Sequence, residues 1–397
     1  MQGQKRGMIA IRHRWSFIRC KFKRLSLIPM KNIFFESNVQ YNWLRWKRHL
    51  LGNKRSEKSY KKQQEIVQHI LSKTDKVQNS LQTQPVDRVC GITDKELFEK
   101  YIKIGKPVII EGGAKDWGCV GKWTPEWLVE NYGDEGITYM DSTPMDMKEG
   151  NFSVRKGVFK DIIEAIEAED QSKYIRFSPL LEDHKNLLKE FDEKWLAKMR
   201  HSFSNGRKLQ LFVGPKGSKT DLHCAVEFNF FTQIYGEKHW YLCAPTNDIA
   251  LDPLNLGFAY FTSTFNPDNP DFEEFPLAAA IDFYECTLKP GDILFNPSSW
   301  WHHVTNKSTS IGVGFRWFNM YRSIQLSFIQ TLLTISCYNP PIWKAMKLSR
   351  RDFGEMFSKK KCLLISNSNT FNSAMSPELF TVDILEKRSK FNLNDCS

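Results

Sequence analysis

Short apolar and aromatic runs, separated by turn residues, dominate the chain between residues 209 and 318. Turn pairs such as Gly214-Pro215 and Pro290-Gly291 stand between runs that are rich in β-branched and aromatic side chains. This pattern predicts strands, which we expect at residues 209–213, 223–233, 238–244, 285–288, 292–296 and 310–318. Many short strands at such spacing are typical of a barrel or sandwich.

The regions on both sides of these strands have helical spacing. Thr93 with Glu96 three residues later predicts a capped helix start, and Thr124 followed by Pro125 predicts a second one. Segments 158–170 and 185–200 are polar on one face, as surface helices are, and a short buried strand is expected at 106–110. We also expect one or two helices within residues 40–80 and further helices after residue 323.

These patterns divide the chain into five predicted parts. They are a basic head that is either disordered or a targeting segment, a helical linker, a barrel domain, a pair of C-terminal helices that cap it, and a polar tail. Their expected ranges are 1–62, 63–88, 89–322, 323–360 and 361–397. The expected fold class is therefore mainly β with flanking α-helices.

The charge is concentrated in the head. Residues 1–62 hold 17 Lys and Arg against two Glu, whereas the whole chain has a net charge of +11. Such a segment is suited to binding nucleic acid or an anionic lipid surface. It also has the composition of a mitochondrial presequence. Two other interpretations of this segment have equal weight: it is a solvated tail without a binding role, or part of it is not translated because the true start is Met30.

Cysteine usage and hydropathy indicate the compartment. The nine cysteines are scattered, odd in number and free of C-x-x-C pairs, which favours a reducing compartment such as the cytoplasm or nucleus. No apolar run reaches about 18 residues, so we expect no transmembrane segment. The apolar stretch 324–335 either pairs with its copy in a homodimer or covers the open end of the barrel.

Two histidines far apart in the sequence lie within motifs that carry the candidate chemistry. The first motif is Thr220-Asp221-Leu222-His223, and the second runs from Phe295-Asn296-Pro297 to His302, about eighty residues later. One His near the start of a strand and another on a facing strand is the arrangement of a two-histidine metal site inside a barrel. Asn229 and Lys238 lie between the two motifs.

In these segments the chain resembles the jumonji C, or cupin-like, group of Fe(II)- and 2-oxoglutarate-dependent oxygenases, especially the protein hydroxylases. The resemblance covers about residues 90–322 and implies a double-stranded β-helix, or jelly roll. It implies that His223 and His302 bind iron, that Thr220 and Lys238 hold the carboxylate of 2-oxoglutarate, and that Asn229 contacts the cosubstrate or the ligand shell. A lysine suits that task because a buried carboxylate needs a charged partner.

The chain departs from this family at one ligand. The family places a carboxylate two residues after the first His, where this chain has Ala225. Glu227 is a tentative substitute ligand, because alternation along one continuous strand would place residues 223, 225, 227 and 229 on the same face.

The departure leaves several functions open. We expect an oxygenase, either a hydroxylase or a demethylase, that acts on a side chain of a protein or of another macromolecule. The alternatives are a catalytically impaired barrel that acts as a binding or scaffold module, and a halogenase-type site in which a halide takes the place left by Ala225. A different metal held by the two His, with Cys224 or His303 nearby, is a further alternative.

Overall fold

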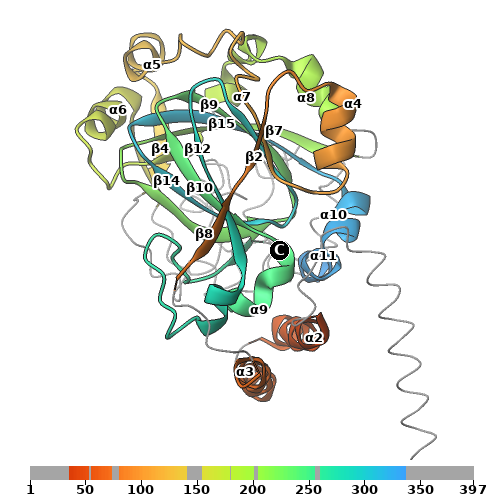
Figure 1. Cartoon of the computed structure of the whole chain (residues 1–397). Coiled ribbons are helices and arrows are strands. Elements are labelled where there is room, and N and C mark those ends of the chain that lie inside the picture. Colours follow the sequence, from red (N-terminus) through yellow and green to blue (C-terminus); the bar gives the residue numbers. More distant parts are fainter. Residues whose placement is uncertain are drawn as a thin grey trace, which may run out of the picture.

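The computed structural model describes residues 35–52, 55–73, 80–140, 154–178, 180–200, 204–254 and 260–336. In this part of the chain two large sheets face each other (Figure 1). The first has the order β1 (Gln82–Pro85), β12 (Asp282–Leu288), β10 (Lys238–Cys243), β14 (Trp301–Asn306), β8 (Lys219–Ala225) and β11 (Tyr260–Thr262). The second has the order β2 (Asp87–Val89), β3 (Val108–Ile110), β13 (Ile293–Asn296), β9 (Phe228–Tyr235), β15 (Ser310–Phe318), β7 (Asn205–Gly214) and β6 (Ile175–Ser178).

The space between the sheets is a packed interior to which both contribute. Trp240 and Leu242 of β10 meet Phe231 of β9 and Leu294 of β13 in one buried cluster. Because successive side chains of a strand point to opposite faces, these residues identify the inward side of each strand. The architecture confirms the mainly β, jelly-roll prediction.

Helices cover the outer face of the second sheet (Figure 1). They are α4 (Asp94–Leu97), the π-helical turn η3 (Phe98–Ile102), α5 (Pro125–Tyr132), α6 (Phe159–Glu167), α7 (Leu180–Asp183), the short helix η4 (Leu187–Glu190) and α8 (Glu193–Met199), with a small hairpin of β4 (Gly136–Met140) and β5 (Val154–Val158). The Thr93–Glu96 capping box and the Thr124 cap before Pro125 are confirmed. The helix expected over 185–200 is instead divided into η4 and α8 at Phe191.

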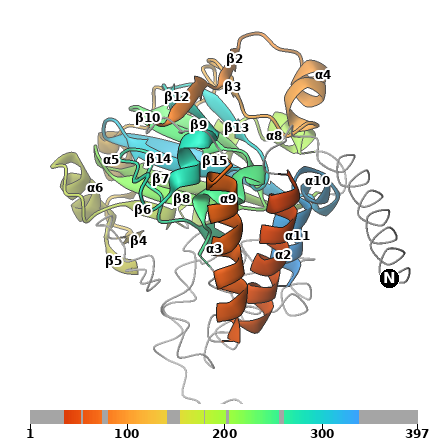
Figure 2. The ribbon, with the colours of Figure 1, turned by 60° about the horizontal axis from the view of Figure 1, so that its bottom comes forward.

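A second group of helices packs against the outer face of the first sheet (Figures 1 and 2). It consists of α2 (Phe35–Leu51), α3 (Glu57–Leu71), α9 (Asp248–Leu251) between the short helices η5 (Pro245–Asn247) and η6 (Pro276–Ala280), and α11 (Phe328–Ile335). The preceding helix α10 (Met320–Leu326) instead packs Leu326 into the cluster of the second sheet. Figure 2 shows α2, α3 and α11 side by side. The end of α2 is tied to that of α11, where Trp46 Nε1 donates to Ser336 Oγ at 3.2 Å.

Two of the expected boundaries are wrong. The head was expected to run to residue 62, but α2 begins at Phe35 and packs on the barrel, so residues 35–51 belong to the folded part of the chain. The linker was expected to be helical to residue 88, but β1 and β2 are strands that pair in parallel with β12 and β3. Residues 1–34 of the head and all of the expected polar tail lie outside the described residues.

The continuous strand expected at 223–233 is also wrong. β8 ends at Ala225 and β9 begins at Phe228, and the two strands belong to different sheets. The chain therefore crosses from one sheet to the other at Val226 and Glu227. The alternation that placed His223, Glu227 and Asn229 on one face does not hold through this turn.

Asp248 at the start of α9 connects the helical group to the barrel. Its fully buried carboxylate accepts hydrogen bonds from Arg45 of α2 at 3.0 Å, from Trp301 of β14 at 2.8 Å and from Gln330 of α11 at 2.8 Å. Burial raises the pKa of Asp248, although Arg45 opposes the shift. The N-terminal helices are thus joined to the strand that carries His302 through one buried ion pair.

We expect Arg45→Ala to lower the free energy of unfolding by about 3 kcal/mol or more, because it leaves the buried Asp248 carboxylate without its cation. Lys61→Ala is the matched control, since the exposed pair of Lys61 with Glu57 contributes less than about 1 kcal/mol. Urea denaturation followed by circular dichroism measures both. Equal, small losses in the two variants would contradict this role of the ion pair.

Candidate functional site

The two candidate histidines face each other across a pair of strands. β8 and β14 are antiparallel, and His223 lies directly opposite His302 in their register. Both side chains are buried, and their ring centroids are 4.0 Å apart with an interplanar angle of 56°. The structure therefore brings together the two imidazoles that the sequence placed eighty residues apart.

Main-chain carbonyls lie beside Nδ1 of both imidazoles. Nδ1 of His223 lies 2.7 Å from the oxygen of Asp221, and Nδ1 of His302 lies 3.0 Å from the oxygen of Trp300. Because a carbonyl oxygen only accepts, the neutral imidazole of His223 is protonated at Nδ1 and has its lone pair at Nε2. Nδ1 of His302 also lies 3.2 Å from the amide of Asn296. Metal-binding histidines are commonly oriented in this way.

The donor set for iron is incomplete beyond these two nitrogens. Ala225 stands two residues after His223 on β8, where a methyl group provides no ligand. Among the described residues no three His, Cys, Asp or Glu side chains form a group that could hold a metal ion. Glu227, in the turn after β8, is thus not gathered with the two imidazoles into a three-ligand site. The nitrogens fit Fe(II), but the carboxylate position does not.

Cys224 and His303 belong to the outer side of the first sheet. Cys224 packs in the apolar cluster beneath the helical group, as its alternation with His223 predicts. His303 Nε2 lies 3.2 Å from Asp268, which also pairs with Lys219 and accepts from Thr305. The hydrogen bond with His303 is the main cause that lowers the pKa of Asp268. Neither Cys224 nor His303 therefore lies with His223 and His302 on the inward side of the sheet.

A group of polar side chains around Lys238, which we call the cationic cluster, lies between the two sheets and has members from both. Its members are Lys238, Arg176, Tyr174 and Thr220. Lys238 is only 1% exposed, and its Nζ lies 3.5 Å from the Tyr174 hydroxyl. Two residues further along β10, the Trp240 ring stacks on His302 with centroids 5.7 Å apart. The cluster therefore shares the barrel interior with the two imidazoles.

Burial and mutual charge shift the pKa values in the cationic cluster. Burial lowers the pKa of Lys238, and Tyr174 only partly opposes this shift. For Tyr174 burial alone would raise the pKa, but the charges of Lys238 and Arg176 and a hydrogen bond with Thr220 outweigh burial, so its pKa is lowered. Both shifts have the direction that a local excess of positive charge produces.

The interior also holds buried polar atoms that have no hydrogen-bond partner among the described residues. They include the Nε1 of Trp240, the Nε of Arg176, the Oδ1 of Asn229 and both amide atoms of Gln210. Buried polar groups are normally paired. A polar, anionic molecule such as 2-oxoglutarate would supply acceptors to Lys238 and to several of these donors. The cationic cluster therefore fits the cosubstrate.

Sequence reasoning missed Tyr174, Arg176 and Gln210. Tyr174 and Arg176 stand two apart around the start of β6, and their spacing is the alternation of an edge strand that is only four residues long. Asn229, by contrast, reaches the interior from β9 of the other sheet, where it lies opposite Asn296. The sequence argument placed Asn229 on the same strand as His223, whereas the structure places the two residues on strands of facing sheets.

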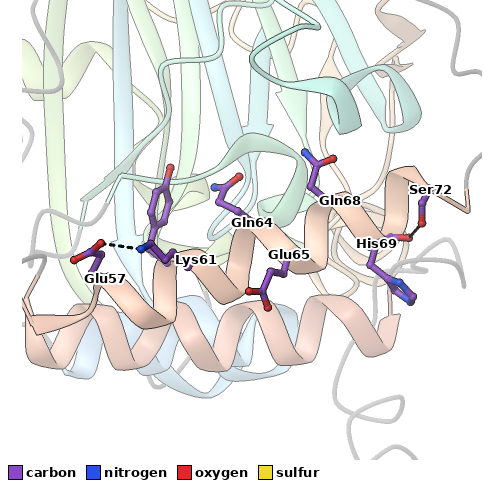
Figure 3. Close-up of a pocket in the computed structure, with 8 residues that line it drawn as sticks. Glu57, Lys61, Gln64, Glu65, Gln68, His69 and Ser72 are labelled. Carbon is purple, nitrogen blue, oxygen red and sulfur yellow. Dashed lines mark hydrogen bonds and ion pairs between the residues drawn. The ribbon is translucent and has the colours of Figure 1, made fainter.

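A shallow surface hollow follows α3 (Figure 3). All of its lining residues lie between Glu57 and Ser72, and Figure 3 shows them as a row along this one helix. The barrel contributes no lining residue. The hollow is therefore separate from the imidazole pair and from the cationic cluster.

Comparison with known proteins identifies the family to which the barrel belongs. The family model described as "Cupin-like domain" matches residues 94–323. The chain is 25% identical over 225 residues to lysine-specific demethylase 8 of Xenopus tropicalis, covering 55% of this chain and 49% of that protein. It is 27% identical over 261 residues to tRNA wybutosine-synthesizing protein 5 of Mus musculus, covering 59% and 78%. The match thus spans about half the length of the first relative.

We expect Lys238→Met to raise the melting temperature of the ligand-free protein, because it removes a buried ammonium that has no carboxylate partner among the described residues. The same change should abolish the thermal stabilisation that millimolar 2-oxoglutarate gives to the unaltered protein, which is about 2.7 kcal/mol at a hundredfold excess over Kd. Lys61→Met on α3 serves as the control and should keep that stabilisation. A destabilised Lys238→Met variant that still responds to 2-oxoglutarate would contradict this account.

Proposed function

Because the chain belongs to the cupin-like domain family, we propose that its barrel is a 2-oxoglutarate-dependent oxygenase, a hydroxylase or demethylase that acts on a side chain of a protein or another macromolecule. The observation that carries the proposal is the buried Lys238 ammonium, which forms no ion pair with a described residue. It lies in the same barrel interior as two opposed imidazoles. The distal carboxylate of 2-oxoglutarate would pair with this ammonium.

The residues of the site divide into two groups by what they do. Lys238, with the hydroxyls of Tyr174 and Thr220, is positioned to hold the distal carboxylate of 2-oxoglutarate. His223 and His302 present their Nε2 lone pairs for Fe(II), while Asn229 offers an amide oxygen from the facing sheet. When bound, the iron would couple the oxidative decarboxylation of 2-oxoglutarate to succinate and CO2 with oxidation of a substrate C–H bond. The polypeptide binds and orients the reactants.

The substrate class follows from the relatives only in general terms. One relative is named as a lysine demethylase and another as a tRNA wybutosine-synthesizing protein. Exposed lysines along α2 and α3, such as Lys47, Lys58 and Lys62, provide a positively charged surface next to the barrel. They are consistent with the proposed contact between residues 1–62 and nucleic acid or another anionic surface.

The compartment and the assembly remain proposals. Among the described residues Cys90, Cys119, Cys224, Cys243 and Cys286 are free thiols, which supports an intracellular, reducing location in the cytoplasm or nucleus; import into mitochondria would depend on residues 1–34. No described helix is long and apolar enough to span a membrane. α11 turns Gln330, Thr331 and Leu333 inward, and the exposed Tyr321 and Phe328 are the side chains through which a homodimer of C-terminal helices would form.

We expect purified protein supplied with Fe(II), 2-oxoglutarate and O2 to form succinate, measured by mass spectrometry. His302→Ala and Lys238→Met should each lower the rate about a hundredfold or more, because each removes a group on which binding or positioning depends. His239→Ala is the matched control, since His239 neighbours Lys238 on β10 but bonds to Thr287 on the outer side. Binding of 2-oxoglutarate without succinate would instead identify a binding module.

We expect Ala225→Asp to tighten Fe(II) binding, because it places a carboxylate two residues after His223 and on the same side of β8. An increase of about tenfold in affinity corresponds to about 1.4 kcal/mol. The measurement is competition with a chromogenic chelator under anaerobic conditions. Ala225→Asn, which has the same size as the aspartate but no negative charge, is the matched control and should give a smaller increase.

If Ala225→Asp leaves the affinity unchanged, the side chain at position 225 does not reach the metal and the assignment of the two imidazoles is wrong. Glu227→Gln, examined in the same assay, tests the substitute ligand. An unchanged iron content would end that hypothesis.

A further inference from the structure

A second buried cation lies beside Lys238. Arg176, on edge strand β6, is 7% exposed, and its guanidinium stacks over the Tyr174 ring at 4.2 Å. Lys238 contacts the hydroxyl of the same tyrosine from the other sheet. Tyr174 therefore lies between an arginine and a lysine that come from opposite walls of the barrel.

Arg176 is held in place but is not neutralised. One of its terminal nitrogens donates to the main-chain oxygen of Lys219, at the start of the strand that carries Thr220 and His223. Its Nε is buried and has no hydrogen-bond partner among the described residues. No described carboxylate forms an ion pair with Arg176 or with Lys238. The interior thus brings two positive charges together without an acidic side chain.

Such an arrangement is costly unless an anion enters it. Buried charges in proteins are normally paired, and two like charges in a medium of low polarity repel each other. A bound carboxylate would remove both penalties at once, because it is attracted by both cations. A monocationic site would suffice to bind one carboxylate, so the second cation needs its own explanation.

We propose that Arg176 is the second cation of the 2-oxoglutarate subsite, and that with Lys238 it makes binding depend on a charged distal carboxylate. This inference rests on the proposed function and deepens it. Lys238 supplies the direct contact, whereas Arg176 strengthens the field at the distal carboxylate and holds Tyr174 by stacking. The subsite therefore discriminates strongly against oxoacids that lack the distal carboxylate.

The test compares two ligands on the metal-free protein by calorimetry and by thermal shift. 2-Oxoglutarate carries the distal carboxylate, and 2-oxopentanoate has the same chain without it. We expect Arg176→Gln to weaken 2-oxoglutarate binding roughly tenfold or more, as loss of a charged partner does, and to change 2-oxopentanoate binding less than about twofold. Arg176→Lys, which keeps the charge, should retain most of the preference for 2-oxoglutarate.

A structural role for Arg176 gives a different result. If Arg176 only closes the barrel through the Lys219 carbonyl, then the Lys and Gln variants will lose stability alike and will weaken both ligands by the same factor. That result overturns the proposal, as does unchanged 2-oxoglutarate binding in Arg176→Gln. Arg88→Gln is the matched control, because Arg88 is paired with Asp292 on another part of the barrel.

The outcomes also separate this proposal from the proposed function. If Lys238→Met loses 2-oxoglutarate selectively while Arg176→Gln does not, the cosubstrate site stands and the role of Arg176 is wrong. If the unaltered protein binds the two oxoacids equally, the cosubstrate site itself is wrong. Should Arg176→Gln fail to fold, the ligand preference of Arg176→Lys still decides, because loss of that preference in a charge-conserving variant contradicts the proposal.

Discussion

The register of β8 on β14 is the constraint on which the site depends. It places His223 opposite His302, and the carbonyls of Asp221 and Trp300 lie beside Nδ1 of the two rings. Because side chains alternate along a strand, a slip of one residue would turn either imidazole to the outer face. In that slipped register Cys224 or His303, which now face outward, would take its place. The chemistry of the interior thus follows from the pairing of two strands.

The interior has more positive charge than a complete site of this kind would have. A carboxylate is missing at Ala225, and Arg176 adds a cation next to Lys238. Both differences favour an anionic occupant, because no described carboxylate forms an ion pair with Lys238 or Arg176. Burial is the main cause that lowers the pKa of Lys238, and the charge of Arg176 adds to it. For Tyr174 the charges of Lys238 and Arg176 lower the pKa against the effect of burial. Binding and stability are therefore opposed at Lys238, as they commonly are at functional sites.

The N-terminal helices extend the structural unit beyond the part that the family model matches. α2 and α3 lie outside residues 94–323, yet Arg45 reaches the buried Asp248, which also accepts from Trp301 next to His302. An ion pair with no access to water is strongly destabilised when one partner is lost. The helices are consequently part of the folded body, and changes in them act on the strand that carries the site.

The sequence by itself determined the strand-rich core, the capped helices at Thr93 and Thr124, and the two histidine motifs, because these depend on local periodicity and on residues close together in the chain. Only the tertiary structure decided that the chain changes sheets between Ala225 and Phe228, which removed the single-face argument for Glu227. It also revealed Tyr174 and Arg176, whose strand is short and whose partners, Lys238 and Lys219, are distant in sequence. Local patterns determine to which face of a strand a side chain points. Which residues it then contacts across the barrel depends on long-range strand pairing, which periodicity does not encode.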